Sequence, residues 1–167
     1  GLLLSTDLNS FHKRQAIFFQ TLLETDDFIS ADIIAEELGI SRRGLSRDIN
    51  RMKEVLLSYQ LELESKSGVG IKIVGTELNK RLLYLYEVMD YLEHELELPH
   101  ELLATYADFM DNHRFPLDVE RTFLSTLKLT ILRKEKAVGE EGLSWFTSQD
   151  KLDLPSIFYD ILAYFLG

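Results

Sequence analysis

Residues 30–57, SADIIAEELGISRRGLSRDINRMKEVLL, decide the fold of the first half of this chain. Ser30 is a favoured N-terminal cap of a helix, and Gly39 is a residue that commonly follows the end of one. We therefore predict a helix over residues 31–38, with an apolar stripe made by Ile34, Ala35 and Leu38.

A second helix is predicted from Ser41, another N-cap residue, to about residue 57. Its apolar residues recur at offsets of four, three and four and define one buried side: Leu45, Ile49, Met52 and Leu56. The short connection Gly39-Ile40-Ser41 between the two helices suits the tight turn of a helix-turn-helix.

The segments on either side complete a winged helix. Residues 11–24 have apolar side chains at helical spacing, which predicts a preceding helix. After the second helix, residues 61–65 and 71–74 alternate with period two around the turn-forming residues 67–70, which predicts a β-hairpin. Three helices followed by a hairpin is the winged helix order, with the hairpin as the wing.

The exposed side of the second helix carries the chemistry of a DNA-reading surface. Arginine bridges the O6 and N7 of guanine or clamps phosphates, asparagine pairs with adenine, and serine donates or accepts. Amides at the helix start and lysines at the wing add phosphate contacts. The candidate DNA-binding residues are Ser41, Arg42, Arg43, Ser46, Arg47, Asn50, Arg51, Lys66, Ser67 and Lys72.

Two structural alternatives stay open at this point. The arginines would form an ordinary solvated face if they paired along the helix with Asp48 or Glu54. The wing lysines would be ordinary solubilising residues of an exposed turn. A third alternative is functional: a helical adaptor or sensor whose winged domain binds protein instead of DNA.

The second half of the chain is predicted to be all-helical. We expect helices at about residues 78–95, 101–112, 117–137 and 154–166, with a loop between the last two. The chain is thus mainly α, with a winged helix-turn-helix domain over residues 1–75 and a helical regulatory or dimerisation domain over residues 76–167. The apolar segments at residues 157–159 and 161–166 are candidates for a homodimer interface.

Residues 34–43, continued by Leu45, residues 47–49, Met52 and residues 68–75, resemble the amino-terminal helix-turn-helix of bacterial sugar-operon activators. These are the mannitol- and lichenan-type regulators, relatives of the beta-glucoside antiterminators, which carry phosphotransferase-system regulation domains. The resemblance implies transcriptional control of carbohydrate uptake or utilisation, possible contacts with phosphotransferase-system proteins, and a chain that is a fragment of a longer regulator.

Residues 126–133 resemble the helix of that regulation domain in which a phosphorylatable histidine precedes an arginine by seven residues. Thr126 occupies the histidine position, which argues against phosphorylation there and favours a degenerate or dimerising domain. His113 is the remaining candidate for phosphorylation. The winged module also heads bifunctional biotin-protein ligases, but no Gly/Arg-rich adenylate loop or strand-rich body follows residue 75, so we expect a non-enzyme without cofactor or metal.

The distribution of charge along the chain limits where DNA can bind. The net charge is −10, yet residues 11–75 have nine Lys/Arg against ten Asp/Glu, whereas residues 76–167 have nine against seventeen. We therefore expect contact with double-stranded DNA to be confined to one edge of the first half. The sequence has no cysteine, no secretory signal and no apolar run near the ~20 residues that span a bilayer, so we expect a cytoplasmic protein.

Overall fold

The computed structural model describes residues 10–92, 104, 106–108, 111–112, 116–133 and 136. The chain forms two compact units, Gly1–Leu92 and Glu93–Gly167. Within the described residues, no helix is long and apolar enough to cross a membrane.

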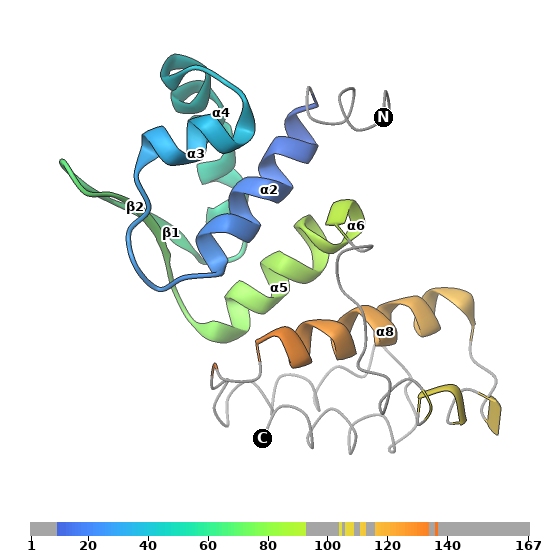
Figure 1. Cartoon of the computed structure of the whole chain (residues 1–167). Helices are drawn as coiled ribbons and strands as arrows, with labels where there is room; N and C mark the ends of the chain where they lie inside the picture. The colour runs from blue at the N-terminus through green and yellow to red at the C-terminus, as the bar shows by residue number, and fades with distance from the viewer. Residues whose placement is uncertain are drawn as a thin grey trace. The chain divides into compact units, whose positions relative to one another are not determined.

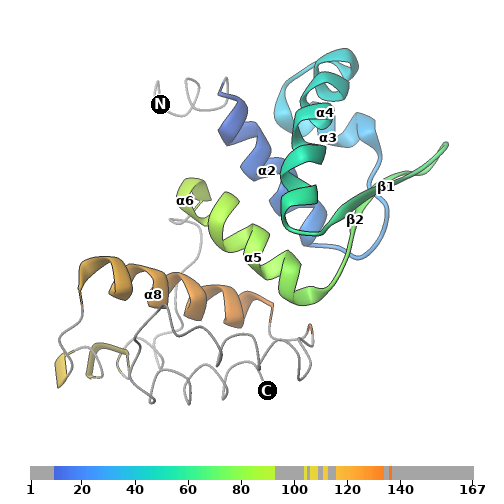
Figure 2. The ribbon, with the colours of Figure 1, turned by 180° about the vertical axis from the view of Figure 1, so that it is seen from behind.

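The first unit has the order of a winged helix, and the predicted mainly helical fold is confirmed (Figure 1). Its elements are α2 (Phe11–Leu23), α3 (Ala31–Leu38), α4 (Arg42–Ser58), β1 (Glu62–Lys66), β2 (Gly70–Val74), α5 (Glu77–Glu87) and α6 (Met89–Leu92). The hairpin of β1 and β2 extends away from the helices in both views (Figures 1 and 2).

Local signals define the turn between α3 and α4. Gly39 has a left-handed φ of 67°, its N–H donates to the carbonyl of Glu36, and the N–H of Ile40 donates to the carbonyl of Ala35. These two bonds form a Schellman motif, which satisfies carbonyls at the helix end and favours glycine. Ser41 then starts α4 by accepting a hydrogen bond from the N–H of Gly44, at 3.0 Å.

The wing is an antiparallel pair in which Glu64 lies opposite Lys72 and Ser65 lies opposite Ile71. At its tip the N–H of Val69 donates to the carbonyl of Lys66, and Gly68 has a φ of 74°. A positive φ at the third residue of a four-residue turn is typical of a type II turn and favours glycine.

A third segment pairs with the wing, which the sequence did not predict. Ile29, in the connection between α2 and α3, exchanges two backbone hydrogen bonds of 2.9 Å with Ile71 of β2. Gly70 permits this approach, because a Cβ at that position would overlap the backbone carbonyl of Ile29. The wing is therefore attached to the segment that leads into the helix-turn-helix.

One apolar core holds the helices and the wing together. Buried side chains come from α2, α3, α4, the wing and α5, with Phe18, Leu45, Met52, Ile73 and Leu83 among them. The predicted stripe of α4 forms part of this core, although Ile49 is half-buried. Burial of side chains this large supplies most of the stabilisation of the unit.

The region after the wing differs from the prediction of a single helix over residues 78–95. The helix ends at Glu87, and the short α6 follows after Val88, whose φ of −116° departs from helical geometry. The compact unit also extends beyond the expected boundary at residue 75, because α5 and α6 pack against α2 and bury Leu83, Tyr84 and Met89.

In the second unit, α8 spans Leu117–Leu132 and agrees with the predicted helix over residues 117–137 apart from its end. Phe123, Leu127 and Leu129 are buried, and the ring of Phe123 stacks with that of Tyr106 at a centroid distance of 6.1 Å. The predicted helix at 154–166, its preceding loop and the candidate dimer segments lie outside the described residues.

Candidate nucleic-acid interface

The polar side of α4 points away from the core, as the helical pattern predicts. We call its five side chains the recognition face: Arg43, Ser46, Arg47, Asn50 and Arg51. All five are exposed, while Leu45, Met52 and Leu56 on the opposite side are almost fully buried. The helix therefore presents three guanidinium groups and two short polar groups on one surface.

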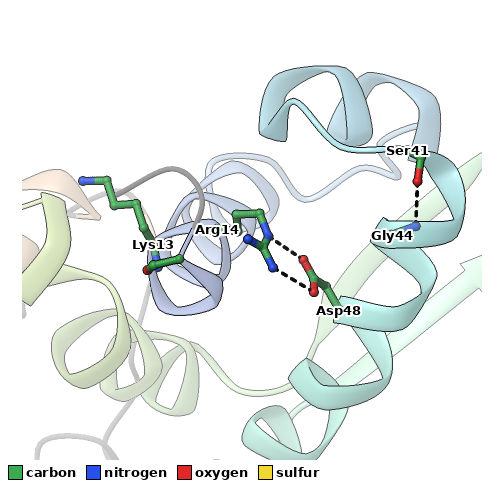
Figure 3. Close-up of polar contacts among 6 residues, drawn as sticks. Lys13, Arg14, Ser41, Gly44 and Asp48 are labelled. Atoms are coloured by element: carbon green, nitrogen blue, oxygen red, sulfur yellow. Dashed lines mark hydrogen bonds and ion pairs between the residues drawn. The ribbon is translucent and has the colours of Figure 1, made fainter. Parts of the chain in front are cut away.

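Asp48 is part of the core side of α4 and does not pair with the arginines of the recognition face. Its two carboxylate oxygens accept hydrogen bonds from Arg14 of α2, Nε at 2.7 Å and an Nη at 3.1 Å (Figure 3). The hydrogen bond to Asp48 raises the pKa of Arg14 above its ordinary value, against the lowering effect of partial burial. This bidentate contact fixes α4 on α2.

With Asp48 occupied by Arg14, Arg43 and Arg47 have no ion pair with any described residue. Glu54, the other expected partner, is exposed and forms no ion pair within the same part of the chain. Within the described residues, neither carboxylate therefore neutralises these arginines, and an ordinary solvated face remains the alternative to a DNA-binding one. The two guanidinium groups keep their donors for an external acceptor.

The start of α4 is partly engaged within the protein. Arg42 forms an ion pair with Asp32 of α3, in which both side chains are largely exposed. Ser41 uses its hydroxyl oxygen to cap the helix and is exposed as well (Figure 3). An exposed ion pair contributes little to stability, so Arg42 is still able to exchange Asp32 for a phosphate.

Arg51 has an aromatic partner that sequence reasoning missed. Its guanidinium carbon lies 3.6 Å from the centroid of the Phe11 ring, at the start of α2. This is a close cation–π contact between two residues of different helices that are 40 positions apart in the sequence. No local sequence pattern predicts such a pair, because the contact depends on how α2 crosses α4.

The wing brings Lys66 and Lys72 to a second aromatic ring. Their ammonium nitrogens lie 5.9 Å and 4.6 Å from the centroid of Phe28, in the connection between α2 and α3. Ser67 follows at the turn and is exposed. The three predicted wing residues are thus on one hairpin, with both lysines gathered at Phe28, which the sequence analysis did not single out.

The other end of α4 is held by a polar contact with α5. Tyr59, directly after α4, donates its hydroxyl proton to Glu87 at 3.0 Å. Burial, and then the hydrogen bond to Glu87, raise the pKa of Tyr59 well above its ordinary value. The tyrosine therefore stays protonated and keeps donating throughout the physiological pH range.

The two regulatory candidates lie apart from this surface in the sequence. Thr126 is on α8, is 9% exposed, and donates its hydroxyl proton to the carbonyl of Thr122 at 2.8 Å. Arg133, seven residues later, is buried as well. His113 lies outside the described residues, and within those residues no group of His, Asp and Glu has the arrangement of a metal site.

The region that carries this surface is similar to a known type of domain. Residues 14–72, from α2 to β2, match the family described as HTH domain, and this stretch includes the helix-turn-helix and most of the wing. The match begins at Arg14 and ends at Lys72, two residues assigned above to the α2–α4 contact and to the wing.

Particular relatives share this region. The chain is 32% identical over 98 residues to a protein of Bacillus subtilis (strain 168) named probable licABCH operon regulator, which covers 59% of this chain and 15% of that protein. It is 31% identical over 77 residues to UPF0122 proteins of Streptococcus pneumoniae serotype 19F (strain G54) and strain 70585, covering 46% of this chain and 66% of each relative. The chain thus spans a small part of the licABCH regulator. No solved structure matches.

Proposed function

We propose that this chain is the DNA-binding part of a transcriptional regulator, with α4 as the helix that enters the major groove. The observation that carries the proposal is the state of Arg43 and Arg47: both are exposed and without an ion pair in the described structure, on a helix that Arg14 and Asp48 hold in place. The match to the HTH domain and the similarity to an operon regulator support the same reading.

The positions of the candidate DNA-binding residues favour two kinds of contact, with base edges and with the sugar-phosphate backbone. Arg43, Arg47 and Asn50, at the centre of the recognition face, suit base edges in the groove. Ser46 lies at its margin and suits either a base or a phosphate. The sugar-phosphate backbone is assigned to the residues at the rim: Ser41, Arg42, Arg51, Lys66, Ser67 and Lys72.

The same proposal includes the kind of operon that is controlled and the role of the second half of the chain. Similarity to the probable licABCH operon regulator supports control of an operon. The sequence resemblance to sugar-operon activators is the reason to propose that this operon serves carbohydrate uptake or utilisation. We propose that the second half dimerises the protein or receives a signal, with phosphotransferase-system proteins as candidate partners. His113 is the proposed phosphorylation site, and Thr126 marks the position where that domain type has its histidine.

Selection of duplexes from a random pool by the purified chain tests the proposed function and yields the operator. Affinity for a selected duplex should fall on the order of 10³-fold between 50 and 200 mM salt if roughly six phosphates are contacted, because each contact releases condensed counterions. Absent binding, or binding that salt leaves unchanged, would favour the alternative of an adaptor whose winged domain binds protein.

Arg47→Ala should weaken binding to the selected duplex by about 1–3 kcal/mol if Arg47 reads a base, and binding to a scrambled duplex much less. If Arg47 holds a phosphate instead, both duplexes should lose affinity equally. Lys80→Ala is the matched control, because it removes one positive charge from α5, which is not part of α4 or the wing. Unchanged affinity of Arg47→Ala for both duplexes would remove Arg47 from the interface.

A further inference from the structure

We propose that Phe11 is a positioning residue that holds the guanidinium of Arg51 ready to bind a phosphate of the DNA backbone. The inference deepens the proposed function and rests on it. It starts from the cation–π contact, in which the guanidinium carbon of Arg51 lies 3.6 Å from the centroid of the Phe11 ring.

The chemistry of stacking leaves the binding capacity of Arg51 intact. The guanidinium of Arg51 has the ring on one side, with its central carbon 3.6 Å from the centroid, and a guanidinium has five N–H donors, more than one ring can engage. Arg51 is exposed and has no ion pair among the described residues, so these donors face no internal carboxylate. A phosphate oxygen pair fits this planar fork, as in other bidentate arginine contacts.

The position of Arg51 on α4 favours a phosphate over a base. At about 100° per residue, Arg51 lies roughly 100° from Asn50 and midway between Arg47 and Asp48. Asp48 faces α2, where Arg14 binds it, so Arg51 is at the α2 edge of the recognition face. When the centre of a helix face enters the groove, its edges lie along the groove walls, where the phosphates are.

Phe11 is itself held in place, which a positioning residue requires. It is half-buried in the first turn of α2, where Ser10 caps the helix by accepting a hydrogen bond from the N–H of Lys13 at 3.1 Å. Its ring makes an edge contact with the ring of His12 at 5.7 Å, and His12 stacks on Tyr91 of α6 at 6.4 Å. Holding Arg51 against this group reduces the rotamer freedom that the arginine loses on binding.

The test is a double-mutant cycle on the full chain, with a selected duplex and a mixed-sequence duplex as probes. Phe11→Leu should lower affinity for both duplexes by roughly the same factor, on the order of 3-fold, since an exposed cation–π contact is of that size. Phe11→Tyr keeps the ring and should bind like the wild type. In an Arg51→Ala background, Phe11→Leu should have no further effect.

Salt dependence adds a readout that a purely structural role would not produce. Arg51→Ala should reduce the slope of log affinity against log salt by about 0.9, the value of one phosphate contact. Phe11→Leu should leave that slope unchanged, because the charge is still present. Urea unfolding of each variant checks that the affinity differences do not arise from loss of the fold.

Three results would overturn the inference. An equal loss from Phe11→Leu with and without Arg51 would mean that Phe11 only supports the fold. Unchanged or higher affinity of Phe11→Leu would mean that stacking does not prepare Arg51 for DNA. If the wild-type chain bound neither duplex, the proposed function would fail with it, whereas the first two results leave the proposed function standing.

Discussion

Arg14→Met should lower the free energy of unfolding of the first unit by about 3 kcal/mol, the lower end of the range for removing one partner of a buried ion pair. Methionine preserves much of the apolar stem of arginine. The loss of stability therefore reports mainly the removal of the guanidinium charge and not a loss of packing. Asp48 is 7% exposed in the structure and would lose the two donors that bind its oxygens at 2.7 and 3.1 Å. Urea unfolding followed by far-UV circular dichroism measures the change.

The matched double variant separates charge from packing. Arg14→Met combined with Asp48→Leu replaces the ion pair by apolar side chains and should recover most of the loss, because no uncompensated carboxylate remains buried. A single Arg14→Met variant within about 0.5 kcal/mol of the wild type, the usual range of surface substitutions, would contradict the assignment of this pair as the contact that fixes α4 on α2.

Gly70→Ala should destabilise the first unit by at least about 2 kcal/mol, from a backbone conformation that L side chains rarely adopt and from the overlap of the new methyl group with neighbouring backbone. Gly70 has a φ of 149°, and its added Cβ would overlap the carbonyl of Ile29. Relief of the overlap requires separating Ile29 from Ile71, which breaks two hydrogen bonds. Urea unfolding measures the loss, and hydrogen exchange at Ile29 and Ile71 locates it.

Gly68→Ala is the control for this prediction. Gly68 also has a positive φ, at 74°, but a Cβ there would meet nothing within 4 Å. Only the left-handed conformation is then penalised, at about 1 kcal/mol. Equal effects of the two variants would show that the close approach of Ile29 to the wing contributes nothing to stability.

Both stability predictions bear on the proposed interface. The Arg14–Asp48 contact fixes the helix that carries the recognition face, and the Ile29–Ile71 bridge fixes the hairpin that carries Lys66 and Lys72. A DNA-binding surface gains affinity when its parts are held in place before binding, because less conformational freedom is lost. Loss of either contact should therefore weaken DNA binding as well as the fold.

Local sequence signals were sufficient to predict the helix-turn-helix and its wing. Ser30, Gly39 and Ser41 mark where α3 starts, where it ends and where α4 begins, because caps and left-handed glycines act within a few residues of chain. The period of apolar residues then determines which side of α4 is buried. The recognition face follows from that period alone, since its members occupy the remaining side.

Polar pairs between distant segments could not be predicted in this way. Pairing of Asp48 with the arginines was one alternative at the level of sequence, but Asp48 is buried and binds Arg14, 34 positions earlier. The packing of α5 and α6 could not be predicted for a similar reason: in the sequence they look like the start of a helical second half, whereas in the structure they pack against α2. Periodicity within one segment does not identify the segment that covers it.

The sequence by itself thus determined the order of elements, the caps, the wing and the exposed side of α4, because these depend on short-range hydrogen bonding and on helical or strand periodicity. Only the tertiary structure decided which cations on that surface have partners. Arg42 pairs with Asp32, Arg51 makes a cation–π contact with Phe11, and Arg43 and Arg47 have no ion pair in the described residues. Those differences arise from the crossing of helices that are distant in the chain, which no local pattern encodes.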